Sequence, residues 1–176
     1  MSFSGIALYC LRAGSFAAAI CILYGAACLL RRKKPGYRRL LGLAYLAALV
    51  QITVLRGGVN WQDVLHAARP APQLVPLKTT FELLGGGLWS FIYNTVGNLI
   101  WFVPLGLLLG RGRALRALLL GAALSAAIEL SQYLLMTGLT DIDDVIINAL
   151  GSHLGSGKYR LYEKRKNPDL RKIHGT

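Results

Sequence analysis

Long uncharged apolar runs are the feature that most limits the fold of this chain. The 18 residues of Ala13–Leu30 and the 22 residues of Leu88–Leu109 include no charged side chain. A third run, Ala114–Met136, includes only Arg116 and Glu129 as charges. Helices of this length, at about 1.5 Å rise per residue, cross a hydrocarbon core of roughly 30 Å. We therefore predict an integral membrane protein built from α-helices.

The basic residues predict how these helices are oriented. The formal net charge is +12, and 16 of the 20 Lys and Arg residues fall in three blocks, at residues 31–39, 111–116 and 158–172. Each block follows a hydrophobic segment, which is the positive-inside pattern of membrane proteins and not the pattern of a nucleic-acid-binding surface. We expect the three blocks to face the cytoplasm, and we expect no nucleic-acid partner.

Cytoplasmic placement of the three blocks sets the number of crossings. The expected fold is an all-α polytopic membrane helix bundle with about five transmembrane helices, its N-terminus outside and its C-terminus inside the bacterial cytoplasmic membrane. If the first segment does not cross, the remaining four keep the same orientation. The whole chain, 1–176, forms a single membrane domain with a basic cytoplasmic tail at 158–176. The expected spans are residues 13–30, 40–55, 88–109, 114–136 and 142–157.

Residues 56–87 form the external connection of this topology. Asn60 precedes a short helical pattern as a capping side chain, and a second short helix is expected over Lys78–Leu84, where three glycines end it. We expect both short helices to lie at the outer membrane interface. An ordinary loop is the alternative interpretation of this segment.

Small residues spaced four apart predict where the spans pack closely. Such pairs are typical of membrane helices whose backbones approach one another. Pro104 lies in the third span and is expected to kink it. The small-residue pairs are Gly106 with Gly110, Gly121 with Ser125, and Gly151 with Gly155.

Polar side chains occur at matching heights on three of the predicted spans. On each span they are three or four residues apart and share one helix face. A charged residue at the centre of a span costs about 2.5–3.5 kcal/mol on insertion scales. We therefore predict that these side chains converge on one polar pocket that opens outward. They are Asn94 and Asn98 on the third span, Glu129 and Gln132 on the fourth, and Asp141, Asp144 and Asn148 on the fifth.

Two interpretations of these polar residues remain open. Hydrogen bonding between helices accounts for the three asparagines. It accounts less well for Glu129 and Asp144, because Gln or Asn would serve the same purpose without a charge, so these two are favoured as functional residues. Asp143 points away from the shared face and is expected to cap the N-terminus of its own helix, where a carboxylate is favourable.

Three sequence blocks resemble the signatures of VanZ-like proteins, with a VanZ-like core at residues 74–155. The blocks are QLVPLKTT, NTVGNLIWFVPLGLLLG and IELSQYLLMTGLTDIDDVIINALGSHLG. VanZ-like proteins are small bacterial membrane proteins, and the namesake is associated with low-level teicoplanin resistance. The resemblance implies a function in the cell envelope without assigning a reaction.

The chain departs from the VanZ-like pattern at two places. The tripeptide at 138–140 is Gly-Leu-Thr where the family usually has an Arg, and Leu77 replaces the usual Phe. The resemblance implies that the missing Arg would have neutralised the carboxylates or bound an anion. Arg56, Arg69 or Lys78 is the expected substitute.

The predicted function is binding by a non-enzymatic membrane protein. Its expected partners are membrane lipids, through the head group of an envelope lipid or a lipid-linked cell-wall precursor, or a lipoglycopeptide of the teicoplanin type, towards which it confers tolerance. One alternative is an intramembrane enzyme in which Glu129 and Asp144 are the catalytic acid–base pair or hold a divalent cation. A small proton- or cation-coupled transporter is the other alternative. The sequence predicts no cofactor and no dedicated metal site.

Overall fold

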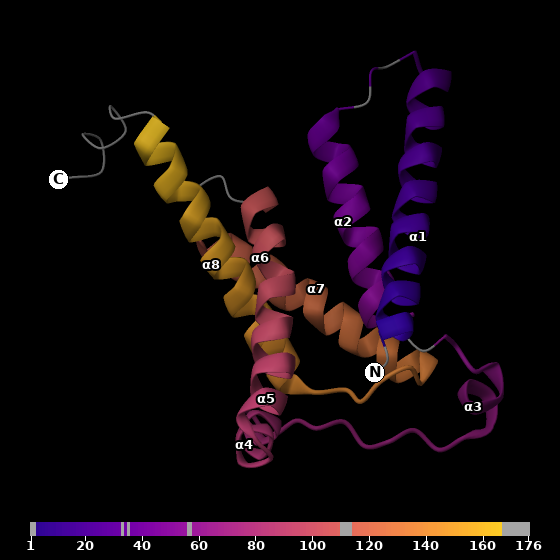
Figure 1. Ribbon diagram of the computed structural model, residues 1–176, viewed down its shortest axis with the longest axis vertical. Helices are drawn as coiled ribbons and strands as arrows, with labels where there is room; N and C mark the ends of the chain where they lie inside the picture. The colour runs from indigo at the N-terminus through magenta and orange to yellow at the C-terminus, as the bar shows by residue number, and fades with distance from the viewer. Residues whose placement is uncertain (1–2, 33, 35, 56–57, 110–113, 167–176) are drawn as a thin grey trace. The chain divides into compact units, whose positions relative to one another are not determined.

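The computed structural model describes residues 3–32, 34, 36–55, 58–109 and 114–166, and every regular element in these ranges is helical. Contacts divide the chain into two compact units. Unit 1 comprises Met1–Pro70 and Leu130–Leu139, and unit 2 comprises Ala71–Glu129 and Thr140–Thr176. The elements, labelled in Figure 1, are α1 (Phe3–Leu30), α2 (Tyr37–Thr53), α3 (Trp61–His66), α4 (Lys78–Gly85), α5 (Leu88–Phe91), the π-helix η1 (Ile92–Val96), α6 (Gly97–Leu109), α7 (Ala114–Leu135) and α8 (Ile142–Lys166).

Two helical stretches are long and apolar enough to cross a membrane. They are Leu88–Leu109, which joins α5, η1 and α6, and Ala114–Leu135, which is α7. A buried core helix of a soluble protein would meet the same test, but only 17% and 28% of their most apolar windows are buried. Gly14–Leu30 is a shorter apolar stretch within α1. Two of the five predicted spans thus satisfy the criterion, and the count of five stays a prediction.

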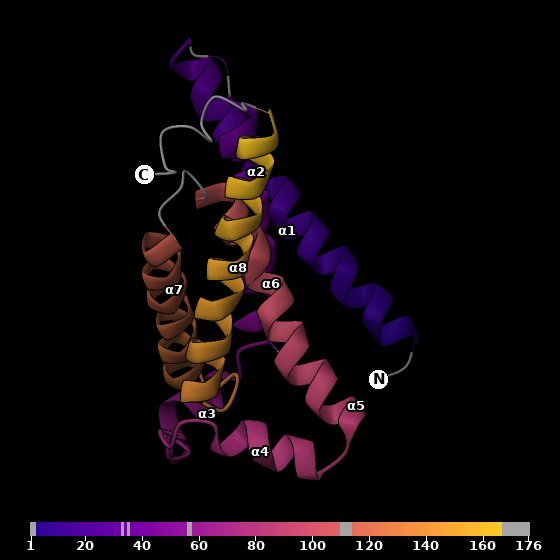
Figure 2. The same ribbon diagram turned by 90° about the vertical axis from the view of Figure 1, so that its left-hand side faces the viewer.

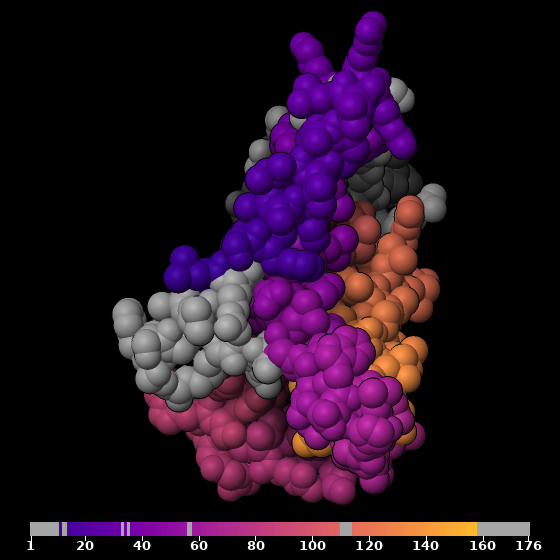
Figure 3. Space-filling view, turned by 90° about the vertical axis from the view of Figure 1, so that its right-hand side faces the viewer, coloured from indigo at the N-terminus to yellow at the C-terminus, as the bar shows by residue number. Residues whose placement is uncertain are grey.

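Unit 1 is built on the antiparallel pair α1 and α2 (Figure 1). Ala47, Leu49 and Val54 are the buried apolar residues at this part of the chain. The long indigo face of α1 is seen in Figure 3. The large apolar side chains of α1 that are described and exposed are Leu11, Phe16, Ile22, Leu23, Leu29 and Leu30.

Both short helices predicted in the connection between α2 and α5 are confirmed. In unit 1, Asn60 caps α3, since its side-chain oxygen accepts a hydrogen bond from the Gln62 backbone N–H at 3.1 Å. In unit 2, α4 ends at Gly85, and Gly87 follows with φ 123, a backbone conformation that glycine adopts readily. A capping residue at the start of α3 and glycines at the end of α4 were therefore sufficient to locate the two helices.

Unit 2 is organised by the close packing of α6 against α8, which lie side by side in Figures 1 and 2. A Cβ atom at Gly151 would overlap the Leu99 carbonyl, and one at Gly155 would overlap the Val103 carbonyl. A Cβ atom at Gly106 would overlap the backbone of α8 in the same way. The small-residue spacing thus marked a true backbone approach, although Gly110 lies outside the described residues.

Two helices of unit 2 have features that the sequence did not predict. Helix α6 is preceded by irregular hydrogen bonding in the π-helix η1, and it continues through Pro104, so the kink expected there stays a prediction. Helix α8 continues to Lys166, so the predicted basic tail begins within a helix and its last residues, 167–176, lie outside the described chain.

Candidate functional site

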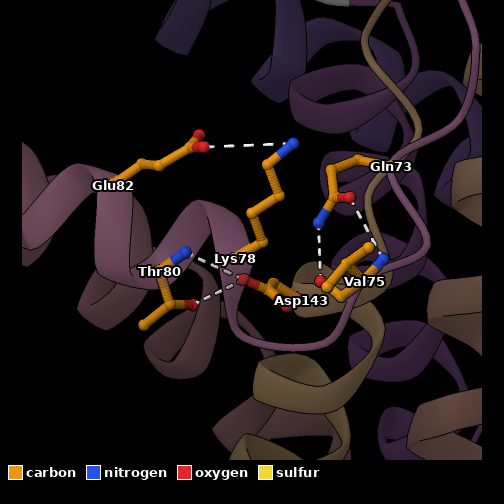
Figure 4. A network of polar contacts seen from close by, with 6 residues as sticks. All are labelled: Gln73, Val75, Lys78, Thr80, Glu82 and Asp143. Carbon is orange, nitrogen blue, oxygen red and sulfur yellow. Dashed lines mark hydrogen bonds and ion pairs between the residues drawn. The ribbon is translucent and has the colours of Figure 1, made fainter.

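The start of α4 is held by a carboxylate from α8, and this contact defines what we call the α4–α8 junction (Gln73, Leu77, Thr80 and Asp143). Helix α4 has Leu77 at its N-cap position, and the leucine side chain has no atom that can accept a hydrogen bond from the first turn. The Asp143 carboxylate accepts hydrogen bonds from the Leu77 N–H, the Thr80 N–H at 2.8 Å and the Thr80 hydroxyl at 2.9 Å. Figure 4 shows the two Thr80 contacts. Asp143 therefore caps α4.

The expectation that Asp143 caps its own helix is wrong. The residue immediately before α8 is Asp141, and its Oδ1 accepts a hydrogen bond from the Asp143 N–H at 2.9 Å. Asp141 thus occupies the N-cap position of α8, which leaves Asp143 free to reach α4. Only 2% of Asp143 is exposed, so its charge depends on these donors.

A backbone pairing continues the junction towards the start of α8. The Gln73 N–H donates to the Thr140 carbonyl at 2.8 Å, and the Ile142 N–H donates to the Gln73 carbonyl at 3.0 Å. The Gln73 side-chain amide bonds both backbone groups of Val75, as Figure 4 shows. The connection that leads into α4 is therefore fixed to the turn that leads into α8. In Figure 2, α4 lies across the end of unit 2 at which α8 begins.

One face of α8 and the facing sides of α6 and α7 carry a second group of polar residues. We call Asn98, Ser125, Glu129, Asp141, Asp144 and Asn148 the polar cluster. The Asn98 side-chain amide donates to the Asp144 carboxylate at 2.6 Å, which joins α6 to α8. The two residues were predicted on separate spans at matching heights, and the structure brings them into contact.

Glu129 joins α7 to the turn before α8. Its carboxylate accepts a hydrogen bond from the Asp141 N–H at 2.9 Å, and its backbone carbonyl accepts one from the Thr140 hydroxyl at 3.3 Å. Only 5% of Glu129 is exposed. The carboxylate therefore faces the interior of unit 2 and not its outer surface.

Ser125 and Asn148 continue the polar cluster one helical turn further along α7 and α8. The Asn148 amide donates to the Ser125 hydroxyl at 2.8 Å, and that hydroxyl donates to the Asp144 carbonyl at 3.4 Å. Both side chains are buried. Sequence reasoning assigned Ser125 only a role as a small residue at a helix contact. Ser125 lies four residues before Glu129 on the same helix face, and this spacing could have placed its hydroxyl in the polar cluster.

The polar cluster is rich in negative charge. The carboxylates of Glu129, Asp141 and Asp144 lie near enough to one another for their charges to repel. Over the described ranges, the ion pair that the structure shows is Lys78 with Glu82, at 4.0 Å and exposed on α4 (Figure 4). Each of the three carboxylates accepts a hydrogen bond from an amide N–H: Glu129 from the Asp141 backbone, Asp141 from the Asp143 backbone and Asp144 from the Asn98 side chain.

Two of the predicted pocket residues lie elsewhere. Asn94 is exposed and its amide donates to the Ser90 carbonyl at 2.8 Å, within the same helical stretch. Gln132 belongs to unit 1, where its amide donates to the Thr53 carbonyl at 3.1 Å. Asn98, Glu129, Asp141, Asp144 and Asn148 are the predicted residues that the structure brings together.

The expected substitutes for the missing Arg make other contacts. Arg69 lies over the Tyr133 ring in unit 1, with its guanidinium carbon 5.9 Å from the ring centroid, a cation–π geometry. Lys78 pairs with Glu82, and Arg56 lies outside the described residues. Within the described chain, no group of three His, Cys, Asp or Glu side chains is arranged to hold a metal ion.

Two apolar helical stretches of spanning length, with few buried residues, suggest that this all-α chain is a small helical membrane protein. The chain belongs to the VanZ/LLP1 family, whose family model matches residues 42–163. Protein VanZ of Enterococcus faecium is 30% identical to it over 134 residues, which are 74% of this chain and 77% of that relative. No solved structure matches the chain. The resemblance to VanZ-like proteins is therefore confirmed, and the matched region includes the junction and the polar cluster.

Proposed function

We propose that this chain is a multi-pass protein of the bacterial cytoplasmic membrane whose polar cluster binds the head group of an envelope lipid. Through that lipid it confers tolerance to a lipoglycopeptide of the teicoplanin type. Membership of the VanZ/LLP1 family supports the link to the antibiotic. The observation that carries the binding role is the burial of the Glu129 carboxylate beside Asp144, because a buried charge is retained where it has a function.

Placement of the polar cluster at the outer side of the membrane completes this proposal. Five crossings, with the N-terminus outside and the C-terminus inside, put the starts of α5 and α8 and the end of α7 near the outer surface. The apolar side chains of α4, including Phe81 at 66% exposed, then lie in the outer interface. A reporter that is active only in the cytoplasm tests this topology. Fused after Thr176, it should be active, and an inactive reporter on a well-expressed fusion would contradict the internal C-terminus.

The test of function uses single charge-neutralising substitutions in the full chain. Glu129→Gln and Asp144→Asn keep the size of each side chain and remove its charge. We expect either substitution to reduce the teicoplanin concentration that a producing strain tolerates to that of a strain without the protein. Glu82→Gln, at an exposed carboxylate of α4, is the matched control and should retain tolerance.

Membrane levels of each variant must be compared by immunoblot. Unchanged tolerance in well-expressed Glu129→Gln and Asp144→Asn strains would rule out a role of the polar cluster in resistance. The enzymatic and transport alternatives stay predictions. Turnover of lipid-linked substrates by the purified protein would favour the first, and uptake into vesicles would favour the second.

A further inference from the structure

The polar cluster includes one buried acceptor that has no donor. Asn148 is 6% exposed, and its amide nitrogen is satisfied by the Ser125 hydroxyl. Its oxygen, Oδ1, is buried and has no hydrogen-bond partner among the residues that the structure describes. Buried polar atoms are nearly always paired, because an unpaired one has given up its bonds to water without replacement. Thr95 Oγ1, Gln132 Oε1 and Thr137 Oγ1 are also buried without a partner in the described chain, but the Asn148 oxygen is the one that belongs to the polar cluster, where a donor from outside the chain would satisfy it.

The open acceptor belongs to a residue on the same face of α8 as Asp144. Asn148 follows Asp144 by one turn on α8, and Ser125 precedes Glu129 by one turn on α7. The Ser125 hydroxyl contacts both the Asn148 amide and the Asp144 carbonyl, so the amide lies on the side of α8 that carries Asp144. The open oxygen and the Glu129 and Asp144 carboxylates therefore line consecutive turns of neighbouring helices.

The missing donor should carry a positive charge. Glu129 and Asp144 are both acidic, and in the described ranges neither forms an ion pair with Lys or Arg. Among the described residues, no group of three His, Cys, Asp or Glu side chains is arranged as metal ligands. A primary ammonium has three N–H donors and one positive charge, which matches two carboxylates and one amide oxygen.

We propose that the polar cluster binds a primary ammonium group, with Glu129, Asp144 and the Asn148 oxygen accepting its three N–H bonds. This inference rests on the proposed function and narrows it to amine-bearing lipid head groups. A lipid whose nitrogen is fully methylated keeps its charge but has no N–H donor, so it cannot satisfy the Asn148 oxygen.

The test compares lipids that differ only in N-methylation. The full chain is purified in detergent and offered phosphatidylethanolamine, its N-methyl, N,N-dimethyl and trimethyl forms, and phosphatidylglycerol, all with the same acyl chains. Native mass spectrometry measures the lipid retained. We expect retention to fall at each methylation and to be at least tenfold lower for the trimethyl form. Because this series varies the ligand, it does not depend on whether any variant folds.

Two variants and one control locate the site. Asn148→Leu removes the open acceptor and should abolish the preference for phosphatidylethanolamine, while Asp144→Asn should weaken binding of every amine-bearing lipid. Glu82→Gln should bind as the unmodified chain does. Glycerophosphoethanolamine, which has the same amine without acyl chains, is the soluble competitor. Displacement of the lipid by this compound at millimolar concentration would show that the site recognises a soluble amine as well.

The outcomes separate this inference from the proposed function. Equal retention of all methylated forms, with loss of binding in Asp144→Asn, would overturn ammonium recognition and leave head-group binding intact. Retention of no lipid, together with normal antibiotic tolerance of the Asp144→Asn strain, would overturn both. Preference for phosphatidylethanolamine that persists in Asn148→Leu and Asp144→Asn would place the amine elsewhere and overturn the inference.

Discussion

Asp143 and Asp144 are consecutive residues of α8 with different surroundings. Asp143 is buried at the α4–α8 junction, and three donors satisfy its carboxylate. Asp144 is half-buried in the polar cluster, where it receives the Asn98 amide and lies near two other carboxylates. A network whose members are all satisfied holds a fold together, whereas one with repelling charges and an open acceptor suits a ligand.

The largest expected loss of stability comes from breaking the α4–α8 junction. Asp143→Ala leaves the Leu77 and Thr80 backbone N–H groups without their acceptor. We expect it to lower the free energy of unfolding by about 3 kcal/mol, since buried donors lose charge-assisted bonds. Thermal unfolding in detergent measures the change, with Glu82→Ala on the exposed side of α4 as the control, expected within about 0.5 kcal/mol of the unmodified chain. Equal unfolding temperatures of the two variants would mean that the junction is not structural.

The next effect tests whether α6 and α8 hold the polar cluster in place. In Gly151→Ala the new methyl group would overlap the Leu99 carbonyl, so we expect a loss of about 1–3 kcal/mol and weaker lipid retention. Gly157→Ala on the same helix meets no atom within 4 Å and should be neutral or slightly stabilising. Unfolding curves of the two variants in the same detergent compare them. Equal stability would show that the backbones are not in contact.

A smaller effect is expected within the polar cluster. Ser125→Ala leaves the Asn148 amide without its acceptor, and we expect a loss of about 1 kcal/mol. A double-mutant cycle with Asn148→Leu isolates the contact, and the two substitutions together should cost less than the sum of their separate effects by about 0.5–1 kcal/mol. Strict additivity in the measured unfolding free energies would mean that the Ser125–Asn148 bond contributes nothing.

The smallest stability change should accompany the largest functional one. Asp144→Asn keeps an oxygen that can accept from Asn98 and removes a repelling charge. We expect its free energy of unfolding to change by less than about 1 kcal/mol, in the stabilising direction, because the substitution removes a charge beside other carboxylates. Comparing unfolding with teicoplanin tolerance checks the separation of roles. A large loss of stability would place Asp144 with Asp143 as a structural carboxylate.

Helical periodicity explains what the sequence predicted correctly at the site. Residues three or four apart share a helix face, and opposite directions of travel place residues of α6, α7 and α8 at one height. Asn98, Glu129, Asp144 and Asn148 were grouped by this reasoning, and the structure joins them. Local signals located the start of α3, at its capping Asn60, and the end of α4, at its glycines.

Periodicity failed where the backbone or the neighbouring segment departs from a regular helix. Asn94 lies in the π-helix η1, whose wider turns rotate a residue four positions away off the shared face. Asp143 was correctly placed off the shared face of α8, but its partner there is α4, more than sixty residues earlier in the chain. A long-range contact of this kind leaves no periodic signal in the sequence.

The contact of α6 with α8 through glycine has a consequence for ligand choice. With no side chain between the two backbones, there is little freedom to adjust their separation, so Asn98 and Asp144 would meet the proposed head group as a preorganised pair. Selectivity for larger or smaller head groups would then be altered most readily by substitutions on α7. In the proposed head-group site, α7 supplies the Glu129 and Ser125 side chains, which take no part in the glycine contacts between α6 and α8.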